Sequence, residues 1–191
     1  MKVLYLHGYG SKFDPDSAKM QTLKKRGKVS GPDLDYGRGQ QAVVDAVLTF
    51  VDNENYDLIV GTSMGGWLAS HASVLLRVPF VALNPAIRPS QTLQKYIGQT
   101  INYVGYDCLI DDQAVISYED FQTQGGYGHI LCEEGDEVLD AHETISHLKA
   151  YYGTTLVPAG SHRFESLKYH LDQLDQTASI GAKIMASEVN R

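Results

Sequence analysis

The sequence has few cysteines and little positive charge. Only two of its 191 residues are cysteines, Cys108 and Cys132, and their spacing matches no metal site, so we expect a reducing compartment or a protein indifferent to redox state. Cys132 lies in an apolar run and is expected to be packed rather than reactive. Lys and Arg total 16 against 23 Asp and Glu, a formal net charge of −7, and residues 24–26 are the single basic run. Nucleic acid and anionic membrane surfaces are therefore poor candidate partners.

Long apolar runs and ligand-binding motifs are also missing. No run approaches the roughly 20 residues of a membrane-spanning helix, and no secretory signal precedes the strand-like residues 3–6. There is no H-E-x-x-H motif, and His142 and His147 are five residues apart, which places them on different faces of a helix. The glycine-rich loop 31–39 lacks a phosphate-binding pattern. We expect a cytoplasmic protein that uses no metal and no cofactor.

The most informative stretch is Gly61-Thr62-Ser63-Met64-Gly65-Gly66. It follows the short apolar run 58–60, which suits a buried strand, and precedes a segment with helical apolar spacing. G-x-S-x-G between a strand and a helix is typical of a nucleophile elbow, in which a serine occupies a sharp turn. Glycine is needed on both sides because a Cβ would collide where strand and helix approach. We therefore predict that Ser63 is a nucleophile at the carboxyl end of a strand.

Strand and helix patterns alternate along nearly the whole chain. This alternation predicts an α/β fold, with a mostly parallel sheet covered by helices on both faces. We expect a single domain over residues 1–191, with a small lid-like insertion around 90–124. The expected strands are 1–6, 28–30, 58–60, 78–83, 130–132 and 154–157, and the expected helices are 15–26 (capped by Asp14), 40–51, the segment after Ser63, 141–151, and one from about 163 onward.

A serine nucleophile needs a base and an acid that orients the base. In hydrolases with a nucleophile elbow, the acid follows the serine in the sequence and the histidine follows the acid. Asp136 comes just after one predicted strand and His162 just after the last, so they are the preferred partners of Ser63. Four neighbouring carboxylates and four other histidines remain alternatives: Glu133, Glu134, Glu137 and Asp140, and His129, His142, His147 and His170.

The loop after the first strand begins with His7-Gly8-Tyr9. Such a loop supplies one backbone amide of the oxyanion hole in serine hydrolases of this class, and we assign that amide to Tyr9 and the second to Met64. His7 is a further candidate for the catalytic base, but a histidine in such a loop more often has the structural role of ordering the turn.

Together these motifs resemble the YqiA-like small bacterial esterases, a branch of the α/β-hydrolase superfamily. The likeness is carried by residues 4–9, 61–66, 84–89 (Asn-Pro-Ala-Ile-Arg-Pro), 96–99, 135–140 (Gly-Asp-Glu-Val-Leu-Asp) and 160–162. The resemblance implies an α/β-hydrolase fold without a large cap domain, and hydrolysis of esters of small acyl groups, with Ser63, Asp136 and His162 at the family's triad positions.

Several alternatives stay open after this comparison. Met64, Trp67, Ser161 and Arg163 differ from the family's usual residues and bear on the shape of the acyl pocket. Arg88 would either steer a substrate carboxylate or phosphate or form a structural ion pair. A thioester would react through the same acyl-enzyme as an ester, and the competing class is a binding or scaffold protein that kept the fold without turnover.

Overall fold

The centre of the computed structural model is a six-stranded sheet. The structure describes residues 1–102 and 107–188, with side chains over 1–99 and 109–187. All neighbouring strands are parallel, in the order β2-β1-β3-β4-β7-β8. The strands are β1 (Lys2–Leu6), β2 (Lys28–Ser30), β3 (Leu58–Thr62), β4 (Phe80–Leu83), β7 (Gly128–Glu133) and β8 (Gly153–Val157). The predicted parallel sheet is confirmed, and each of the six expected strands overlaps an observed one.

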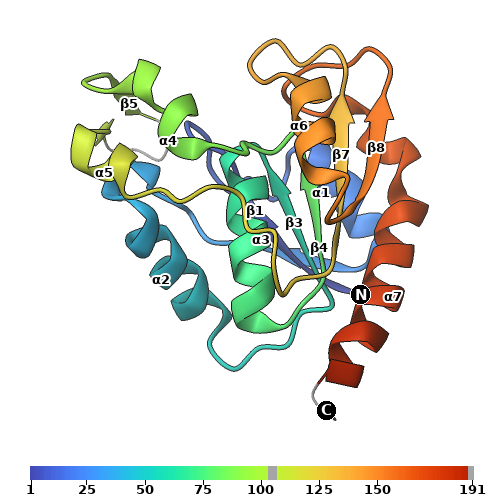
Figure 1. Ribbon diagram of the computed structural model, residues 1–191. Helices are drawn as coiled ribbons and strands as arrows, with labels where there is room; N and C mark the ends of the chain where they lie inside the picture. Colours follow the sequence, from blue (N-terminus) through green and yellow to red (C-terminus); the bar gives the residue numbers. More distant parts are fainter. Residues whose placement is uncertain (103–106, 189–191) are drawn as a thin grey trace.

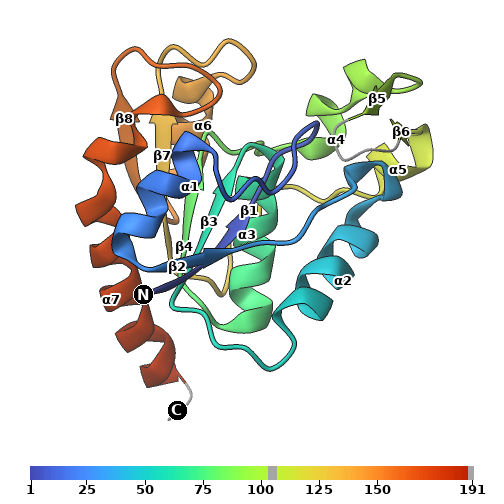
Figure 2. The same cartoon turned by 180° about the vertical axis from the view of Figure 1, so that it is seen from behind.

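Helices cover both faces of this sheet. They are α1 (Ala18–Leu23), α2 (Gln40–Val51), α3 (Met64–Leu76), α6 (Ala141–Leu148) and α7 (Leu171–Glu188). Alternate residues of a strand point to opposite faces. Leu4 and Leu6 of β1 accordingly pack in a cluster with α2, α3 and α6, whereas Val3 and Tyr5 pack with α1 and α7. Helix α3 lies in front of the sheet in Figure 1, and α1 lies in front in Figure 2.

Helix boundaries differ from the expectation at three places. Helix α1 begins at Ala18 because the Ser17 hydroxyl accepts from the Met20 amide, while the Asp14 carboxylate binds the Asp16 amide in the preceding turn. The remainder of the expected helix is a 3-10 turn, η1 (Lys24–Arg26). Helix α6 ends at Leu148, and α7 begins only at Leu171, after the 3-10 helix η4 (Glu165–Tyr169). The expected helix 40–51 matches α2.

The expected insertion at 90–124 is a series of short elements. They are α4 (Pro89–Thr92), η3 (Gln94–Tyr96), the antiparallel pair β5 (Thr100–Asn102) and β6 (Asp107–Leu109), and α5 (Asp112–Ile116), which contacts η2 (Tyr36–Arg38). Residues 103–106 of the insertion lie outside the described residues. In Figure 1 the segment lies at the end of the molecule towards which the strand arrows point. The Trp67 indole donates to the Glu119 carbonyl at 2.9 Å, which fastens the returning chain to α3.

Two features anticipated from composition can be located. Cys132 is free and buried in β7, and burial raises the pKa of its thiol to about 12, so it is packed as expected. The side chain of Cys108 lies outside the described residues. Within 1–102 and 107–188, no helix has the length and apolar character required to cross a membrane.

Candidate active site

Ser63 occupies the turn between β3 and α3. Its backbone adopts φ 57° and ψ −120°, a conformation that only glycine adopts without strain. The flanking glycines are required sterically: a Cβ on Gly61 would lie 1.9 Å from the carbonyl oxygen of Gly65, and one on Gly65 would lie 2.0 Å from that of Leu6. The strand-turn-helix setting predicted for Ser63 is therefore present, with strand and helix too close for any side chain at either glycine.

Ser63, His162 and Asp136 form a continuous hydrogen-bonded row. The Ser63 Oγ lies 3.0 Å from the His162 Nε2, and the His162 Nδ1 lies 2.9 Å from both oxygens of Asp136. The Asp136 side chain is 2% exposed and that of His162 is 19% exposed. These three residues follow β3, β8 and β7, so the sheet brings together groups that are up to 99 residues apart.

The partners of Asp136 fix the direction in which protons can move. One oxygen of Asp136 also accepts from the amides of Val138 and Leu139, at 2.8 and 2.9 Å. A carboxylate held in this way accepts the Nδ1 proton of His162, which leaves the unprotonated Nε2 facing the Ser63 hydroxyl. The arrangement can therefore take a proton from Ser63 and return it to a group bound nearby.

The four rival carboxylates are occupied elsewhere. None contacts the His162 ring within the described residues: Glu133 binds the amides of Ser161, Glu165 and Ser166, Glu134 contacts His142, Glu137 accepts the His162 backbone amide, and Asp140 caps α6 by binding the Glu143 amide. Asp136 is thus the carboxylate placed to orient His162.

The other histidines lie away from Ser63. His129 bonds Thr155 between two strands, His142 is exposed beside Glu134, His147 is in the last turn of α6, and His170 ends η4 rather than lying within a helix as expected.

His7 orders the loop after β1. Its Nδ1 lies 2.9 Å from the Gly8 carbonyl oxygen and its Nε2 accepts from the Leu34 amide at 2.8 Å, which together define a neutral imidazole. Burial lowers the pKa of His7, consistent with that form.

The backbone that carries His162 is held by two buried polar residues. Asn84, which follows β4 at φ 44°, donates to the carbonyls of Ser161 and His162 at 2.9 and 3.2 Å, and its oxygen accepts the Glu133 amide at 2.7 Å. The Glu133 carboxylate in turn accepts three amides on either side of His162. Sequence reasoning assigned no role to Asn84 and treated Glu133 as a rival acid. Their position at strand ends was the available signal.

The two loops expected to form the oxyanion hole both adjoin Ser63. A Cβ built on Gly8 would lie 3.1 Å from the Cβ of Ser63, so the loop from His7 to Tyr9 runs directly beside the serine. Met64 is the first residue of α3, where backbone amides have no partner within the helix. The assignment of the two oxyanion-hole amides to Tyr9 and Met64 stays a prediction.

The chain has relatives among known proteins. The model of an uncharacterised protein family, UPF0227, matches residues 2–178. The chain belongs to the UPF0227 family. Among its relatives, the UPF0227 protein of Pectobacterium carotovorum is 23% identical over 185 residues, covering 94% of this chain and 99% of the relative, and that of Serratia proteamaculans is 25% identical over 179 residues, covering 90% and 96%. This membership confirms the resemblance on which the motifs were compared.

Solved structures similar to this UPF0227 chain share the α/β-hydrolase fold. Est1E from Butyrivibrio proteoclasticus aligns with a TM-score of 0.63 and 15% identity, over 100% of this chain and 88% of that protein. Mouse alpha/beta hydrolase domain-containing protein 10 aligns with a TM-score of 0.64 and 18% identity, over 96% and 90%. The esterase domain of a Rhodothermus marinus protein gives 0.64 and 14%, over 97% and 85%. The predicted fold is confirmed.

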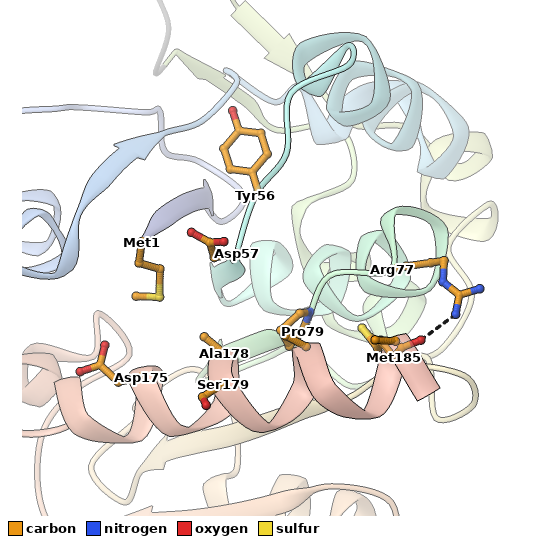
Figure 3. A pocket seen from close by; sticks show the side chains of 11 residues that line it. Met1, Tyr56, Asp57, Arg77, Pro79, Asp175, Ala178, Ser179 and Met185 are labelled. Atoms are coloured by element: carbon orange, nitrogen blue, oxygen red, sulfur yellow. Dashed lines mark hydrogen bonds between the residues drawn. The ribbon is translucent and has the colours of Figure 1, made fainter. Parts of the chain in front are cut away.

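A pocket of about 750 Å³ contains Ser63 and His162 in this UPF0227 protein. Its walls come from the loop after β1, from α1 and from residues 163–168. A second cavity, of about 590 Å³, lies at the opposite end of the sheet, where the central strands begin, between Met1, Tyr56 and α7 (Figure 3). There Arg77 is tied to the Met185 carbonyl at 3.0 Å. Catalytic groups of an α/β sheet gather at the carboxyl ends of strands, so the first pocket is the candidate substrate site.

Arg88 is held in a structural contact. Arg88 forms an ion pair with Glu143 of α6, which is the structural alternative considered for it. Among the described residues, no group of three or more His, Cys, Asp and Glu side chains is arranged to hold a metal ion.

Proposed function

We propose that this protein is a serine hydrolase that cleaves esters of small acyl groups through an acyl-enzyme on Ser63. One observation carries the proposal: the unbroken row from the Ser63 Oγ through both ring nitrogens of His162 to the buried Asp136, built on a strained turn. Strain at a serine persists only where the surrounding structure maintains it, and it is concentrated at functional sites. The fold is shared with the esterase domain of the Rhodothermus marinus protein, but a shared fold does not by itself establish chemistry, so the proposal rests on these three residues.

In the proposed reaction the Ser63 oxygen attacks the ester carbonyl while His162 Nε2 takes the hydroxyl proton. The amides of Tyr9 and Met64 would donate to the oxyanion, the largest electrostatic contribution in such reactions. Collapse of the tetrahedral intermediate breaks the carbon–oxygen bond to the alcohol, which leaves with the proton from His162. Water then attacks the acyl group on Ser63 and loses a proton to His162. The bond between the acyl carbon and the Ser63 oxygen breaks, that oxygen takes the proton back from His162, and the carboxylic acid is released.

A thioester would follow the same path with a thiol as leaving group, so both belong to the proposal. The rival proposal is a scaffold that binds without turnover. The intact row of three residues counts against it, because a scaffold has no need for an unprotonated Nε2 held at 3.0 Å from a strained serine.

Labelling with a fluorophosphonate probe tests the proposal. The native protein should form one adduct, located on Ser63 by mass spectrometry, and Ser63→Ala and heat-denatured protein should form none. His162→Gln should slow labelling by about a hundredfold or more, whereas His142→Gln, an exposed histidine, should not. Equal labelling of Ser63→Ala, or no adduct on folded native protein, would reject the serine mechanism.

A further inference from the structure

The pocket beside Ser63 is lined by basic side chains although the protein is acidic overall. Lys12, Lys19, Arg163 and Lys168 all line it, against two carboxylates, Asp14 and Glu165. The chain as a whole has 23 acidic and 16 basic residues. The balance of charge is therefore reversed where substrate would bind.

Within the described part of the chain, none of these four cations forms an ion pair: none has its nitrogen within 4.0 Å of a carboxylate oxygen, whereas Arg26 and Arg88 elsewhere each form one. Lys168 lies over the ring of Tyr169, 4.8 Å from its centre, which is a cation–π contact and brings no negative charge to the ammonium. One carboxylate of the pocket, Asp14, binds the Asp16 amide in its own turn.

Lys19 is the innermost of the four. Its ammonium donates to the Thr62 hydroxyl at 3.0 Å and to the Arg163 carbonyl at 2.6 Å, and Thr62 and Arg163 are the chain neighbours of Ser63 and His162. An ammonium has three N–H donors, and these contacts use two. A charged donor thus remains available within one residue of both members of the candidate machinery.

The surroundings of Lys19 are poorly suited to an isolated cation. Burial lowers its pKa to about 8, the nearby Glu133 charge opposes this effect, and Arg163 adds to it. An anion placed against the ammonium would offset the cost of burial and supply the missing acceptor.

We propose that the substrate carries an anionic group, a carboxylate or a phosphate, which is bound by Lys19 with Lys12, Arg163 and Lys168 around it. This rests on the hydrolase function proposed above and specifies its substrate class. The wall of the pocket that carries these cations is built by the loop after β1, α1 and residues 163–168, so the anionic group would lie along that wall while the ester carbonyl reaches Ser63.

Matched pairs of esters test the proposal. Mono-4-nitrophenyl glutarate carries a carboxylate where 4-nitrophenyl pentanoate has a methyl group, and 4-acetoxybenzoate and 4-acetoxyphenyl phosphate place a carboxylate or a phosphate on the leaving group, against neutral methyl 4-acetoxybenzoate. We expect kcat/KM to favour the anionic member in at least one pair. The pairs also distinguish which group is bound and on which side of the ester.

The variants Lys19→Met and the double variant Lys12→Gln/Lys168→Gln should lower the anionic-to-neutral ratio by about tenfold or more, the size of one charge-assisted hydrogen bond. Lys183→Met, an exposed lysine of α7, is the matched control and should keep the native ratio. The double variant changes exposed side chains and guards against misfolding of Lys19→Met.

Three outcomes would overturn the proposal: a native preference for the neutral esters, equal rates within every pair, or a ratio unchanged in both variants. The last would mean that Lys19 only holds the Arg163 carbonyl, since a positioning role lowers both rates equally. Failure of the hydrolase function itself looks different, because no ester would be turned over and the fluorophosphonate would leave Ser63 unlabelled.

Discussion

Replacement of Glu133 by glutamine should both destabilise the protein and slow its chemistry. The carboxylate is fully buried, and its two oxygens accept the amides of Ser161 and Glu165 on one side and of Ser166 on the other, at 2.7, 3.2 and 2.7 Å. Burial alone would raise the pKa of Glu133, but the hydrogen bonds from Ser166, Ser161 and Glu165 together lower it below its ordinary value of 4.5. The carboxylate is therefore charged in the folded state and held by backbone donors.

Glutamine has one oxygen where glutamate has two. If that oxygen keeps the amides of Ser161 and Glu165, the new NH₂ group faces the Ser166 amide, and two donors meet. The loss of one charge-assisted hydrogen bond costs about 2 kcal/mol, and in a protein of this length that lowers Tm by about 4–8 °C. Because the lost contact belongs to the loop of His162, kcat for an activated ester should fall by about tenfold or more, as small displacements of catalytic groups are costly.

The neighbouring residue provides the control. Glu134 has the same side chain but is 48% exposed, and among the described residues its carboxylate bonds the exposed His142 alone, so Glu134→Gln should change the free energy of unfolding by less than about 0.5 kcal/mol. Thermal unfolding by circular dichroism and initial rates on 4-nitrophenyl butyrate measure both effects. If Glu133→Gln unfolds within a degree of Glu134→Gln and retains its rate, the carboxylate does not hold the His162 loop and the reasoning is refuted.

Three further predictions concern the turn and the buried histidines. Ser63→Gly should abolish hydrolysis yet keep Tm at or above the native value, because glycine adopts φ 57° without strain, and a large fall in Tm would contradict this. Gly61→Ala should lower the free energy of unfolding by about 3 kcal/mol or prevent folding, because the new Cβ would lie 1.9 Å from a backbone oxygen. Gly98→Ala has no atom within 4 Å of its new Cβ and should lower that free energy by about 1 kcal/mol, because of the positive φ at this position. Equal losses in the two variants would refute the steric account. Burial lowers the pKa of His7 and His71 below 6.5, so just below pH 6.5 these histidines are protonated in the unfolded chain but still neutral in the folded chain. Stability should be complete above about pH 6.5 and fall below it, by at most about 1.4 kcal/mol per pH unit for each histidine, and a Tm that stays level between pH 7.5 and 5 would count against this.

Features set by nearby residues were predictable from the sequence. The apolar runs that are buried on both faces became strands, helix α2 has the bounds that its apolar stripe indicated, and Ser63 lies on the turn that its glycines require. From the order of acid and base after the serine we also predicted Asp136 and His162 as its partners, and the three side chains are hydrogen-bonded in a row. They meet because parallel strands bring their carboxyl ends to the same side of the sheet.

Features set by distant residues were not. Helix α7 was expected from about 163, but the amides of Glu165 and Ser166 bind a carboxylate 32 and 33 residues away, and the chain continues as a 3-10 helix before α7 begins. The same holds for Asn84, whose partners lie 77 and 78 residues further on.

By itself, then, the sequence determined which residues form the sheet and which three side chains meet at its edge, because hydrophobic periodicity and backbone sterics act between near neighbours. Only the tertiary structure decided how His162 is held and where basic side chains line the pocket beside Ser63. Both depend on hydrogen bonds that side chains such as Glu133 and Lys19 form with backbone groups that are distant in the sequence. A local sequence pattern does not predict such hydrogen bonds.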